Sequence, residues 1–240
     1  MNISSLSVIV PAYNEEKRIK QSLQTIEQYL KKRKTDYEII VVDDCSKDAT
    51  VEVVSSLQSD KIRIFSNNTN RGKGHSVRRG VLLAKKKFVL FSDADLSTPI
   101  EELALFEKFI PSFQIIIGSR NLKQSKIIVK QPKLRSMLGK IFPLLVNMLV
   151  LRGIKDTQCG FKLFSSEVAR KIFTPACIER FSFDVEILYL AKKKKIQVKE
   201  VPIHWKNAEG STVHPFRDAI RMFCDILKIR YADMTGKYDE

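Results

Sequence analysis

The sequence predicts an α/β protein with a mostly parallel sheet and helices on both of its faces. Short apolar runs of strand length alternate with segments of helical periodicity through the first half of the chain. Strand, helix and strand at this spacing imply right-handed crossovers, which make neighbouring strands parallel. Acidic or loop motifs also follow the ends of several strands, where open α/β sheets bind their ligands.

The predicted strands are short and mostly apolar. The last of them contains Pro202, which has no N–H to donate to a sheet and therefore indicates an edge strand. The expected strands are Leu6–Val10, Glu38–Asp43, Ile62–Phe65, Phe88–Ser92, Ile115–Gly118 and Ile196–Trp205.

The predicted helices are amphipathic. In the first, Ile19, Leu23, Ile26 and Leu30 are spaced four, three and four residues apart, which leaves Lys and Glu on the opposite face. Further helices are expected over Val51–Leu57, Val77–Ala84, Ser165–Phe173 and Phe216–Tyr231, and from Glu179 onward.

The composition fits a single domain over residues 1–240 and a chain of 27.6 kDa that can bury a sizeable core. The 42 Lys and Arg residues outnumber the 27 Asp and Glu residues, and the net charge of +15 implies an anionic partner. Nucleic acid, anionic lipid and phosphorylated substrates all carry such charge. Acidic clusters at three strand ends oppose binding to a phosphate backbone, so we expect no nucleic-acid partner.

The four cysteines have no C-x-x-C spacing, and the three histidines do not lie near them at zinc-ligand spacings. We therefore expect reduced thiols, no structural zinc and a cytoplasmic protein. Residues Met1–Val10 lack the basic and long apolar regions of a signal peptide. The longest apolar run, Ile141–Leu151, is shorter than the roughly 20 residues that span a bilayer.

Two carboxylates, Asp93 and Asp95, follow the predicted strand Phe88–Ser92. On an extended segment side chains two apart point the same way. Like charges so close raise each other's pKa unless a cation neutralises them, and hard oxygen ligands suit Mg²⁺ or Mn²⁺. The alternative is that one Asp caps the helix that starts near Pro99 while the other is solvated.

The loop Asn70–Gly74 has the sequence N-R-G-K-G and precedes a predicted helix. Glycines permit close approach of the backbone, and a helix N-terminus favours anions, so this loop is a candidate for contact with a nucleotide. The spacing G-x-x-x-x-G-K-[ST] is missing, which excludes a Walker loop.

The segment from Arg120 to Lys155 contains nine Lys or Arg residues and no Asp or Glu, together with a strongly apolar run. Basic and apolar character combined is typical of a segment in a membrane interface. We expect residues 120–152 and 216–231 to be such elements. A core helix hairpin with a solvated basic rim is the alternative for the first of them.

With these motifs in view, the chain resembles the inverting glycosyltransferases of family 2, which have the GT-A fold, over almost its whole length. It is similar in particular to the dolichyl-phosphate glucosyltransferases and their polyprenyl-phosphate relatives. The motifs that carry the resemblance are Val10–Glu16 (V-P-A-Y-N-E-E), Val41–Asp48 (V-V-D-D-C-S-K-D), Asn70–Gly74, Asp93–Leu96 (D-A-D-L), Gly118–Arg120 (G-S-R), Arg152–Phe164 (R-G-I-K-D-T-Q-C-G-F-K-L-F) and Phe183–Tyr189 (F-D-V-E-I-L-Y).

The resemblance implies roles for individual residues. Asp93 and Asp95 would hold Mg²⁺ or Mn²⁺ on the diphosphate of a nucleotide sugar, and Lys73 would reach the same diphosphate. Arg120 and Arg135 would grip the acceptor phosphate. Asp156 stands where the family places a candidate base, and it either accepts a proton or orients the acceptor. The residues implied for the nucleoside are Pro11, Tyr13, Glu15 and Asp44.

The activity implied by the resemblance is transfer of a hexose, glucose from UDP-glucose, to a polyprenyl or dolichyl phosphate with inversion. Ser97 stands where mannose synthases usually have Gln, which disfavours mannose. Mannosyl transfer from GDP-mannose and a soluble glycosyltransferase with a non-lipid acceptor stay open as alternatives. A peripheral position on the cytoplasmic face of a membrane is expected, with a small membrane protein as a candidate partner.

Overall fold

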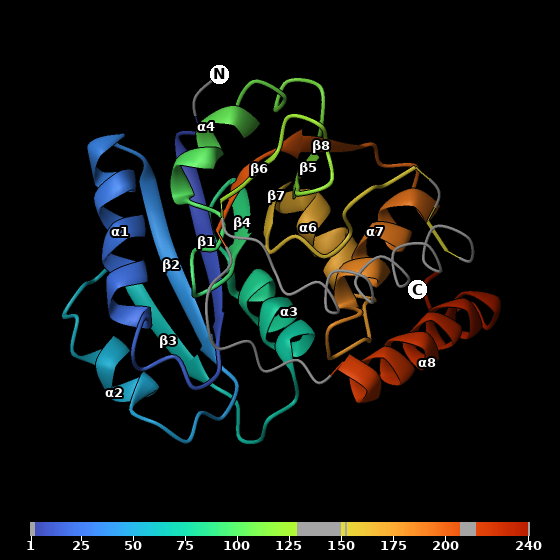
Figure 1. The fold of residues 1–240 in the computed structure, drawn as a ribbon, viewed down its shortest axis with the longest axis horizontal. Helices are drawn as coiled ribbons and strands as arrows, with labels where there is room; N and C mark the ends of the chain where they lie inside the picture. Colours follow the sequence, from blue (N-terminus) through green and yellow to red (C-terminus); the bar gives the residue numbers. More distant parts are fainter. Residues whose placement is uncertain (1–2, 129–149, 152, 207–214, 240) are drawn as a thin grey trace.

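The computed structural model describes residues 3–128, 150–151, 153–206 and 215–239, and the side chains of 215–220 are not described. A seven-stranded sheet with the order β3-β2-β1-β4-β7-β5-β8 lies between two layers of helices (Figure 1). The strands are β1 (Ser5–Ala12), β2 (Asp36–Asp43), β3 (Ile62–Ser66), β4 (Phe88–Ser92), β5 (Ile115–Ser119), β7 (Phe161–Ser165) and β8 (Val198–Pro202). The helices are α1 (Ile19–Lys32), α2 (Thr50–Ser55), α3 (Lys73–Leu83), η1 (Ile100–Glu102), α4 (Leu103–Phe106), α6 (Ser166–Phe173), α7 (Phe183–Lys193) and α8 (Pro215–Met234).

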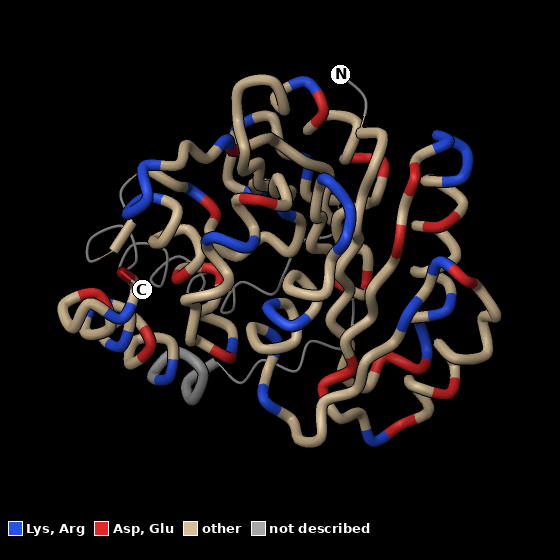
Figure 2. The backbone as a smooth tube through the Cα atoms, turned by 180° about the vertical axis from the view of Figure 1, so that it is seen from behind, with Lys and Arg blue, Asp and Glu red and all other residues tan. Residues whose placement is uncertain are grey.

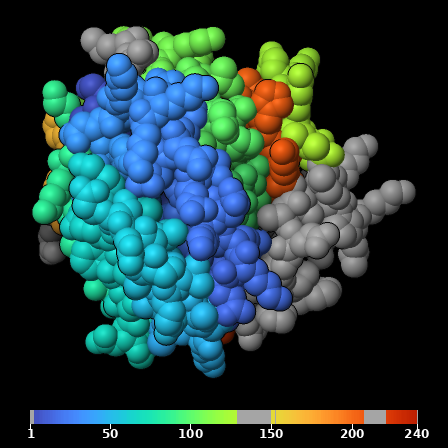
Figure 3. Space-filling model, turned by 90° about the vertical axis from the view of Figure 1, so that its left-hand side faces the viewer, coloured from blue at the N-terminus to red at the C-terminus, as the bar shows by residue number. Residues whose placement is uncertain are grey.

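Helices cover both faces of the sheet, as the sequence predicts. On one face the apolar side chains of α1, η1 and α4, such as Leu23, Ile100 and Phe106, pack against β1, β2 and β7. On the other face α3, α6 and α7 pack against the sheet, and α8 adds Ile226 and Ile229 to the same core. Figure 3 shows the side of the molecule that α1 and α2 cover. The predicted α/β architecture is confirmed.

The strand β7 was not predicted. It lies between β4 and β5 and runs antiparallel to both, whereas the other neighbours in the sheet are parallel. The strand was missed because of Lys162, whose side chain is fully buried in the middle of β7. Lysine is almost never fully buried unless it is paired, so F-K-L-F does not look like a core strand.

The predicted edge strand Ile196–Trp205 is divided in the structure. Its first part is β8, which is the edge strand of the main sheet. Its last two residues form β9 (His204–Trp205), which pairs in parallel with β6 (Lys126–Ile127) in a second, two-stranded sheet. Pro202 ends β8, and the chain then changes sheets.

Two expectations lie mainly outside the described residues. Arg135 and most of the basic, apolar segment 120–152 belong to residues 129–149 and 152, which the structure does not describe. The predicted C-terminal helix is present as α8. In the described parts of the chain, no helix combines the length and apolar character needed to cross a bilayer.

Candidate active site

The loops that follow β1 and β2 are tied together at the carboxyl edge of the sheet. The backbone N–H of Asn14 donates to Ser46 Oγ at 2.9 Å, and the N–H of Lys47 donates to Asn14 Oδ1 at 2.8 Å. The N–H of Glu15 donates to Thr50 Oγ1 at 2.7 Å. Asn14 has a φ of 56°, in the left-handed region that Asn tolerates better than most residues. These contacts fix the loop that carries Tyr13 and Glu15.

Three residues implied for the nucleoside, Pro11, Tyr13 and Glu15, lie half-buried along the end of β1 and the loop after it. Glu15 forms an ion pair with Arg18. Burial raises the pKa of Glu15, and the nearby charges of Asp95 and Asp93 raise it further, against the lowering effect of Arg18. Glu15 therefore lies within electrostatic range of the two aspartates.

The carboxylate of Asp44 is buried, and it organises the loop that leads into α3. Its Oδ1 accepts hydrogen bonds from Asn67 Nδ2 at 2.9 Å and from the N–H of Arg71 at 3.0 Å. Its Oδ2 accepts from the N–H of Gly72 at 2.7 Å. Asp44 therefore lies at the predicted edge of the sheet, and these three bonds give it a structural role in the loop before Lys73.

The glycines of N-R-G-K-G are explained by packing within the protein. A Cβ on Gly72, whose φ is +108°, would lie 2.7 Å from the carbonyl oxygen of Glu179. A Cβ on Gly74 would lie 2.6 Å from the carbonyl oxygen of Ile178. The segment 178–183 thus approaches the start of α3 closely enough to require glycine at both positions, and contact of this loop with a nucleotide stays a prediction.

Lys73, on the first turn of α3, points at the aspartates. Its Nζ lies 2.6 Å from Asp93 Oδ1. Burial acts to lower the pKa of Lys73, but the charges of Asp93, Asp184 and Asp95 outweigh it and raise that pKa above its usual value. Lys73 is therefore a protonated cation in the acidic part of the site.

Behind Lys73 lies a second charged pair that the sequence did not reveal. The ammonium of Lys162 on β7 forms an ion pair with Asp184 on α7, and it also donates to the carbonyl oxygen of Cys159 at 2.5 Å. Burial raises the pKa of Asp184, against the lowering effects of Lys162 and Lys73. A buried carboxylate needs such partners, because an uncompensated charge in the core is costly.

The segment from Asp93 to Leu96 is a turn and not an extended strand. The N–H of Leu96 donates to the carbonyl oxygen of Asp93 at 3.2 Å, and Leu96 has a φ of 46°. Asp95 Oδ1 accepts from the N–H of Ser97 at 2.8 Å. A turn and not an extended strand carries the two carboxylates, so the argument from strand alternation was wrong. Within the described residues, no group of three or more His, Cys, Asp or Glu side chains is arranged to hold a metal ion.

Gly160 provides the space that the Asp93 carboxylate occupies. A Cβ at this position would lie 1.9 Å from Asp93 Oδ2 and 2.3 Å from its Cγ. The N–H of Asp93 also donates to the carbonyl oxygen of Gly160 at 3.1 Å. Any side chain at residue 160 would displace the carboxylate of Asp93.

Arg120 and Asp156 form a forked ion pair. Arg120 donates to Asp156 through its backbone N–H at 2.8 Å, through Nε at 2.7 Å and through Nη2 at 2.8 Å. Burial acts to raise the pKa of Asp156, but these bonds and the charge of Arg120 hold it below its usual value. The guanidinium also lies over the ring of Trp205, 5.6 Å from the centroid.

The structure therefore brings together most of the residues singled out in the sequence and adds four. Three of the four, Gly160, Lys162 and Asp184, belong to motifs that carry the resemblance. The sequence shows these motifs but does not show the contacts that the three residues make. Trp205 lies outside those motifs, and its only signal was that it is the single tryptophan of the chain. Arg135 is not described.

Solved structures of other proteins share this fold. Mannosyl-3-phosphoglycerate synthase from Rubrobacter xylanophilus superposes with a TM-score of 0.67 over 97% of this chain and 75% of that one, at 17% identity. Glucosyl-3-phosphoglycerate synthase from Mycobacterium tuberculosis, in complex with Mn²⁺, UDP-glucose and glycerol 3-phosphate, gives 0.68 over 95% and 79%, at 16% identity. At these identities the likeness establishes the fold alone.

Sequence relatives are closer. The dolichyl-phosphate beta-glucosyltransferase of Dictyostelium discoideum is 42% identical over 96% of this chain and 75% of the relative. The human protein of the same name is 39% identical over 97% and 77%. Residues 7–173 match the family described as Glycosyl transferase family 2. The chain therefore belongs to glycosyltransferase family 2 and has its GT-A fold, which makes it a glycosyltransferase.

Proposed function

We propose that this protein transfers glucose from UDP-glucose to a polyprenyl phosphate of the dolichyl type, with inversion at the anomeric carbon. The observation that carries the proposal is the juxtaposition of an acidic and a basic half-site at one edge of the sheet. Glu15, Asp93 and Asp95 make the acidic half, and Arg120 makes the basic half. One loop before β7 joins the two halves, because Asp156 on this loop holds Arg120 and Gly160 on the same loop contacts Asp93.

The choice of glucose and of a lipid acceptor draws on the relatives. Proteins named dolichyl-phosphate beta-glucosyltransferase are 36–42% identical to this chain over nearly its full length. Ser97 stands at the position where the resemblance implies Gln in a mannose synthase. This residue follows the turn that carries Asp95. Both observations favour glucose over mannose.

The donor occupies the acidic half-site in this proposal. Pro11, Tyr13 and Glu15 border the nucleoside, and Lys73 reaches the diphosphate. Asp44 supports this side indirectly, because it holds the loop before Lys73. A protonated lysine attracts the charge that develops on the leaving diphosphate.

A divalent metal fits the acidic half-site. Asp93 and Asp95 offer hard carboxylate oxygens of the kind that Mg²⁺ and Mn²⁺ prefer, and Gly160 leaves the space that Asp93 needs. Such an ion keeps several waters and takes its other ligands from substrate phosphates, so two protein carboxylates suffice. When bound, it would stabilise negative charge on the leaving diphosphate.

The acceptor phosphate occupies the basic half-site. Asp156 fixes the guanidinium of Arg120 by two side-chain hydrogen bonds, and its lowered pKa makes it a weak base. A base is not required, because a phosphate monoester has a second pKa near 6 and is largely ionised at neutral pH. We therefore assign Asp156 an orienting role, and Arg135 would add a second guanidinium to the acceptor phosphate.

The reaction then follows in one displacement. An ionised oxygen of the acceptor phosphate attacks C1 of glucose on the face opposite the nucleotide. The bond from C1 to the diphosphate oxygen breaks, and UDP leaves with the electron pair. Attack from the opposite face gives inversion, and no proton has to be removed from the attacking dianion.

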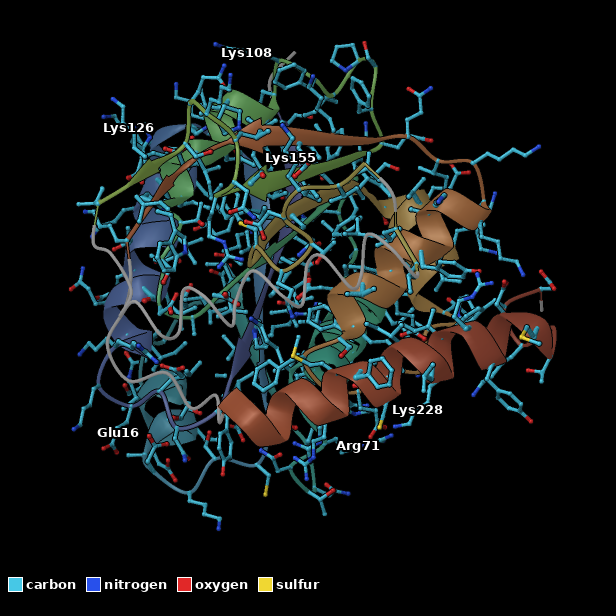
Figure 4. All side chains as sticks on the ribbon, turned by 45° about the vertical axis from the view of Figure 1, so that its right-hand side comes forward. Glu16, Arg71, Lys108, Lys126, Lys155 and Lys228 are labelled. Atoms are coloured by element: carbon cyan, nitrogen blue, oxygen red, sulfur yellow. The ribbon has the colours of Figure 1, made fainter. Side chains whose placement is uncertain are left out.

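The lipid acceptor requires contact with a membrane, which we place at the cytoplasmic face. On α8 the side chains of Phe223, Leu227, Tyr231 and Met234 are exposed at helical spacing. Figure 1 shows α8 at the lower edge of the molecule, toward which β1 and β2 run, and Figure 4 shows Arg71 and Lys228 at the same edge. Exposed apolar and basic side chains together suit an anionic lipid surface. Residues 120–152 would contribute a second interfacial element.

Turnover with purified protein tests the proposal. UDP-glucose, UDP-N-acetylglucosamine and GDP-mannose are each combined with a polyprenyl phosphate in detergent, and with 3-phosphoglycerate as a soluble acceptor. We expect lipid-linked glucose from UDP-glucose alone, and its loss on chelation of divalent metal. Transfer from GDP-mannose, or transfer to the soluble acceptor at a rate that equals that of the lipid, would contradict the proposal.

A further inference from the structure

Trp205 is brought to Arg120 by the pairing of two strands. In the parallel pair of β5 and β8, Ser119 lies opposite Pro202. Arg120 is the next residue on one chain and Trp205 comes three residues later on the other, so both leave the sheet at the same edge. Trp205 belongs to β9, and pairing with β6 fixes its backbone. The N–H of Ile128, just after β6, donates to the carbonyl oxygen of Trp205 at 2.9 Å.

The ring of Trp205 and the carboxylate of Asp156 hold the same guanidinium from different sides. Arg120 Cζ lies 5.6 Å from the centroid of the indole ring, within the range of a cation–π contact. Asp156 binds the Nε and Nη2 edge of the guanidinium. The carboxylate of Asp156 restricts the position of the guanidinium. The indole ring of Trp205, against the face of the guanidinium, also restricts the tilt of the guanidinium plane.

The strand that carries Trp205 also reaches the acidic half-site. The N–H of Lys206 donates to the carbonyl oxygen of Ser97 at 2.8 Å. The N–H of Ser97 in turn donates to Asp95 Oδ1 at 2.8 Å. One short segment thus contacts the arginine of the basic half-site and the turn of the acidic half-site.

We propose that Trp205 is a positioning residue that sets the plane of the Arg120 guanidinium for an oxyanion of a phosphate monoester, and that its strand keeps this arginine in register with the Asp95 turn. The inference rests on the proposed function for the identity of the acceptor. Fixing a flexible arginine before the ligand arrives lowers the entropy lost on binding, so the ring contributes to acceptor affinity.

Substitutions at Trp205 separate positioning from folding. We expect Trp205→Leu to raise the acceptor KM about tenfold or more, the effect of roughly 1.4 kcal/mol, while the donor KM changes less than threefold. Trp205→Phe and Trp205→Tyr keep an aromatic face and should restore most of the loss. Phe109→Leu is the matched control, because it also removes a ring from a cation–π contact. In that contact Lys199 Nζ lies 4.8 Å from the ring centroid of Phe109, and neither residue belongs to the proposed site. Thermal unfolding of each variant shows whether it is folded.

Fluorescence gives a readout that does not depend on turnover. Because the chain has a single tryptophan, its intrinsic tryptophan emission comes from Trp205 alone. We expect farnesyl phosphate to change this emission saturably and farnesol, which has no charge, to leave it unchanged. Fluorinated tryptophans, which weaken the negative face of the ring, should raise the dissociation constant for farnesyl phosphate stepwise with each added fluorine.

The outcomes distinguish this inference from the proposed function. If Trp205→Leu folds and keeps the wild-type acceptor KM, or if fluorination leaves the dissociation constant unchanged, the positioning role of Trp205 is wrong while lipid transfer stands. If farnesyl phosphate alters the emission and fluorination weakens its binding, yet no lipid is glycosylated by the wild type, the positioning role is supported and the proposed acceptor is wrong.

Discussion

Asp95 lies in the turn after β4, where a neutral substitute can keep its hydrogen bond from Ser97. We expect Asp95→Asn to reduce transfer by at least about 100-fold, because it removes charge from the proposed metal site while hardly changing side-chain volume. The rate of sugar transfer and the thermal midpoint would be measured together. Activity within a few-fold of wild type, or full activity in EDTA, would exclude a metal role for this carboxylate.

Gly160 is a second residue-scale determinant, because the Asp93 carboxylate occupies the space of a missing Cβ. Gly160→Ala should lower the rate of transfer by a factor similar to that of Asp93→Asn, since the carboxylate must move. Gly153→Ala is the control, because Gly153 has a φ of +94° and no atom near its Cβ position, so that variant is strained without a collision. If both alanine variants lose activity equally, the loss in Gly160→Ala does not depend on displacement of Asp93.

The lowered pKa of Asp156 leads us to expect different pH dependences for the stability of the protein and for the rate of transfer. The pKa of Asp156 is held below its usual value of 3.8, so the stability that its pair with Arg120 confers is complete at neutral pH and is lost as the pH falls below about 4. Transfer should instead rise with an apparent pKa near 6, that of the acceptor phosphate. The same pH profile is expected in Asp156→Asn, with a higher acceptor KM and a smaller loss than in Asp95→Asn. Loss of the rising limb in Asp156→Asn would identify this carboxylate as the base.

At the scale of elements, the first five strands and the crossover helices could be predicted because each is a local pattern of apolar residues. β7 could not, because the partners of Lys162 come from a loop before it and from α7. Likewise the motif D-A-D-L predicted a pair of carboxylates after β4, but the turn at Leu96 and the space at Gly160 are features that only the fold creates.

The segment after α6 is another element whose role lies in tertiary contacts. Glu186 is fully buried, and it accepts hydrogen bonds from the N–H groups of Cys177 and Ile178 at 2.8 Å each and from the hydroxyl of Tyr238 at 2.6 Å. Ile178 in turn packs against Gly74 at the start of α3. The C-terminal residues thus stabilise the segment against which the Lys73 loop rests.

Tyr238→Phe removes one charge-assisted hydrogen bond from Glu186 and leaves three, which come from the N–H and the thiol of Cys177 and from the N–H of Ile178. We expect it to lower the free energy of unfolding by about 1.5–3 kcal/mol and the thermal midpoint by several degrees. Tyr231→Phe is the matched control, because that tyrosine is 70% exposed and should be neutral. Equal midpoints for the two variants would show that the Tyr238 hydroxyl contributes little; KM values should be unchanged in both.

At the scale of the whole molecule, the excess of positive charge and the exposed face of α8 act together. Figure 2 shows basic and acidic positions interspersed along α8, but Asp225 is buried and Asp233 is paired with Lys193. Arg221 and Arg230 are exposed. Over residues 221–234, whose side chains the structure describes, the outward electrostatic character of α8 is therefore basic, as an anionic surface requires.

Vesicle binding tests this surface. The protein should co-sediment with vesicles that contain anionic lipid and be partly released by high salt, because each basic residue contributes about 1 kcal/mol and is screened. Leu227→Asp should weaken binding severalfold, since Leu227 is 52% exposed on α8. Leu82→Asp, at a leucine 37% exposed on α3, introduces the same charge elsewhere and should bind like wild type. Equal loss in the two variants would mean that added negative charge, and not the face of α8, is responsible.

The position of β7 has a consequence for the synthesis of the chain. β4 leaves the ribosome long before β7, and residues 93–160 separate them, yet the two strands are hydrogen-bonded neighbours. Until β7 arrives, the nascent sheet exposes an unpaired edge along Phe88–Ser92, the kind of edge that pairs wrongly with other chains. Gly160, which precedes β7, reaches Asp93 only when that edge is filled. The nascent chain is thus prone to aggregate until β7 pairs with β4. The contact between Gly160 and Asp93 also forms only then, so we expect the chain to become active when the sheet is complete.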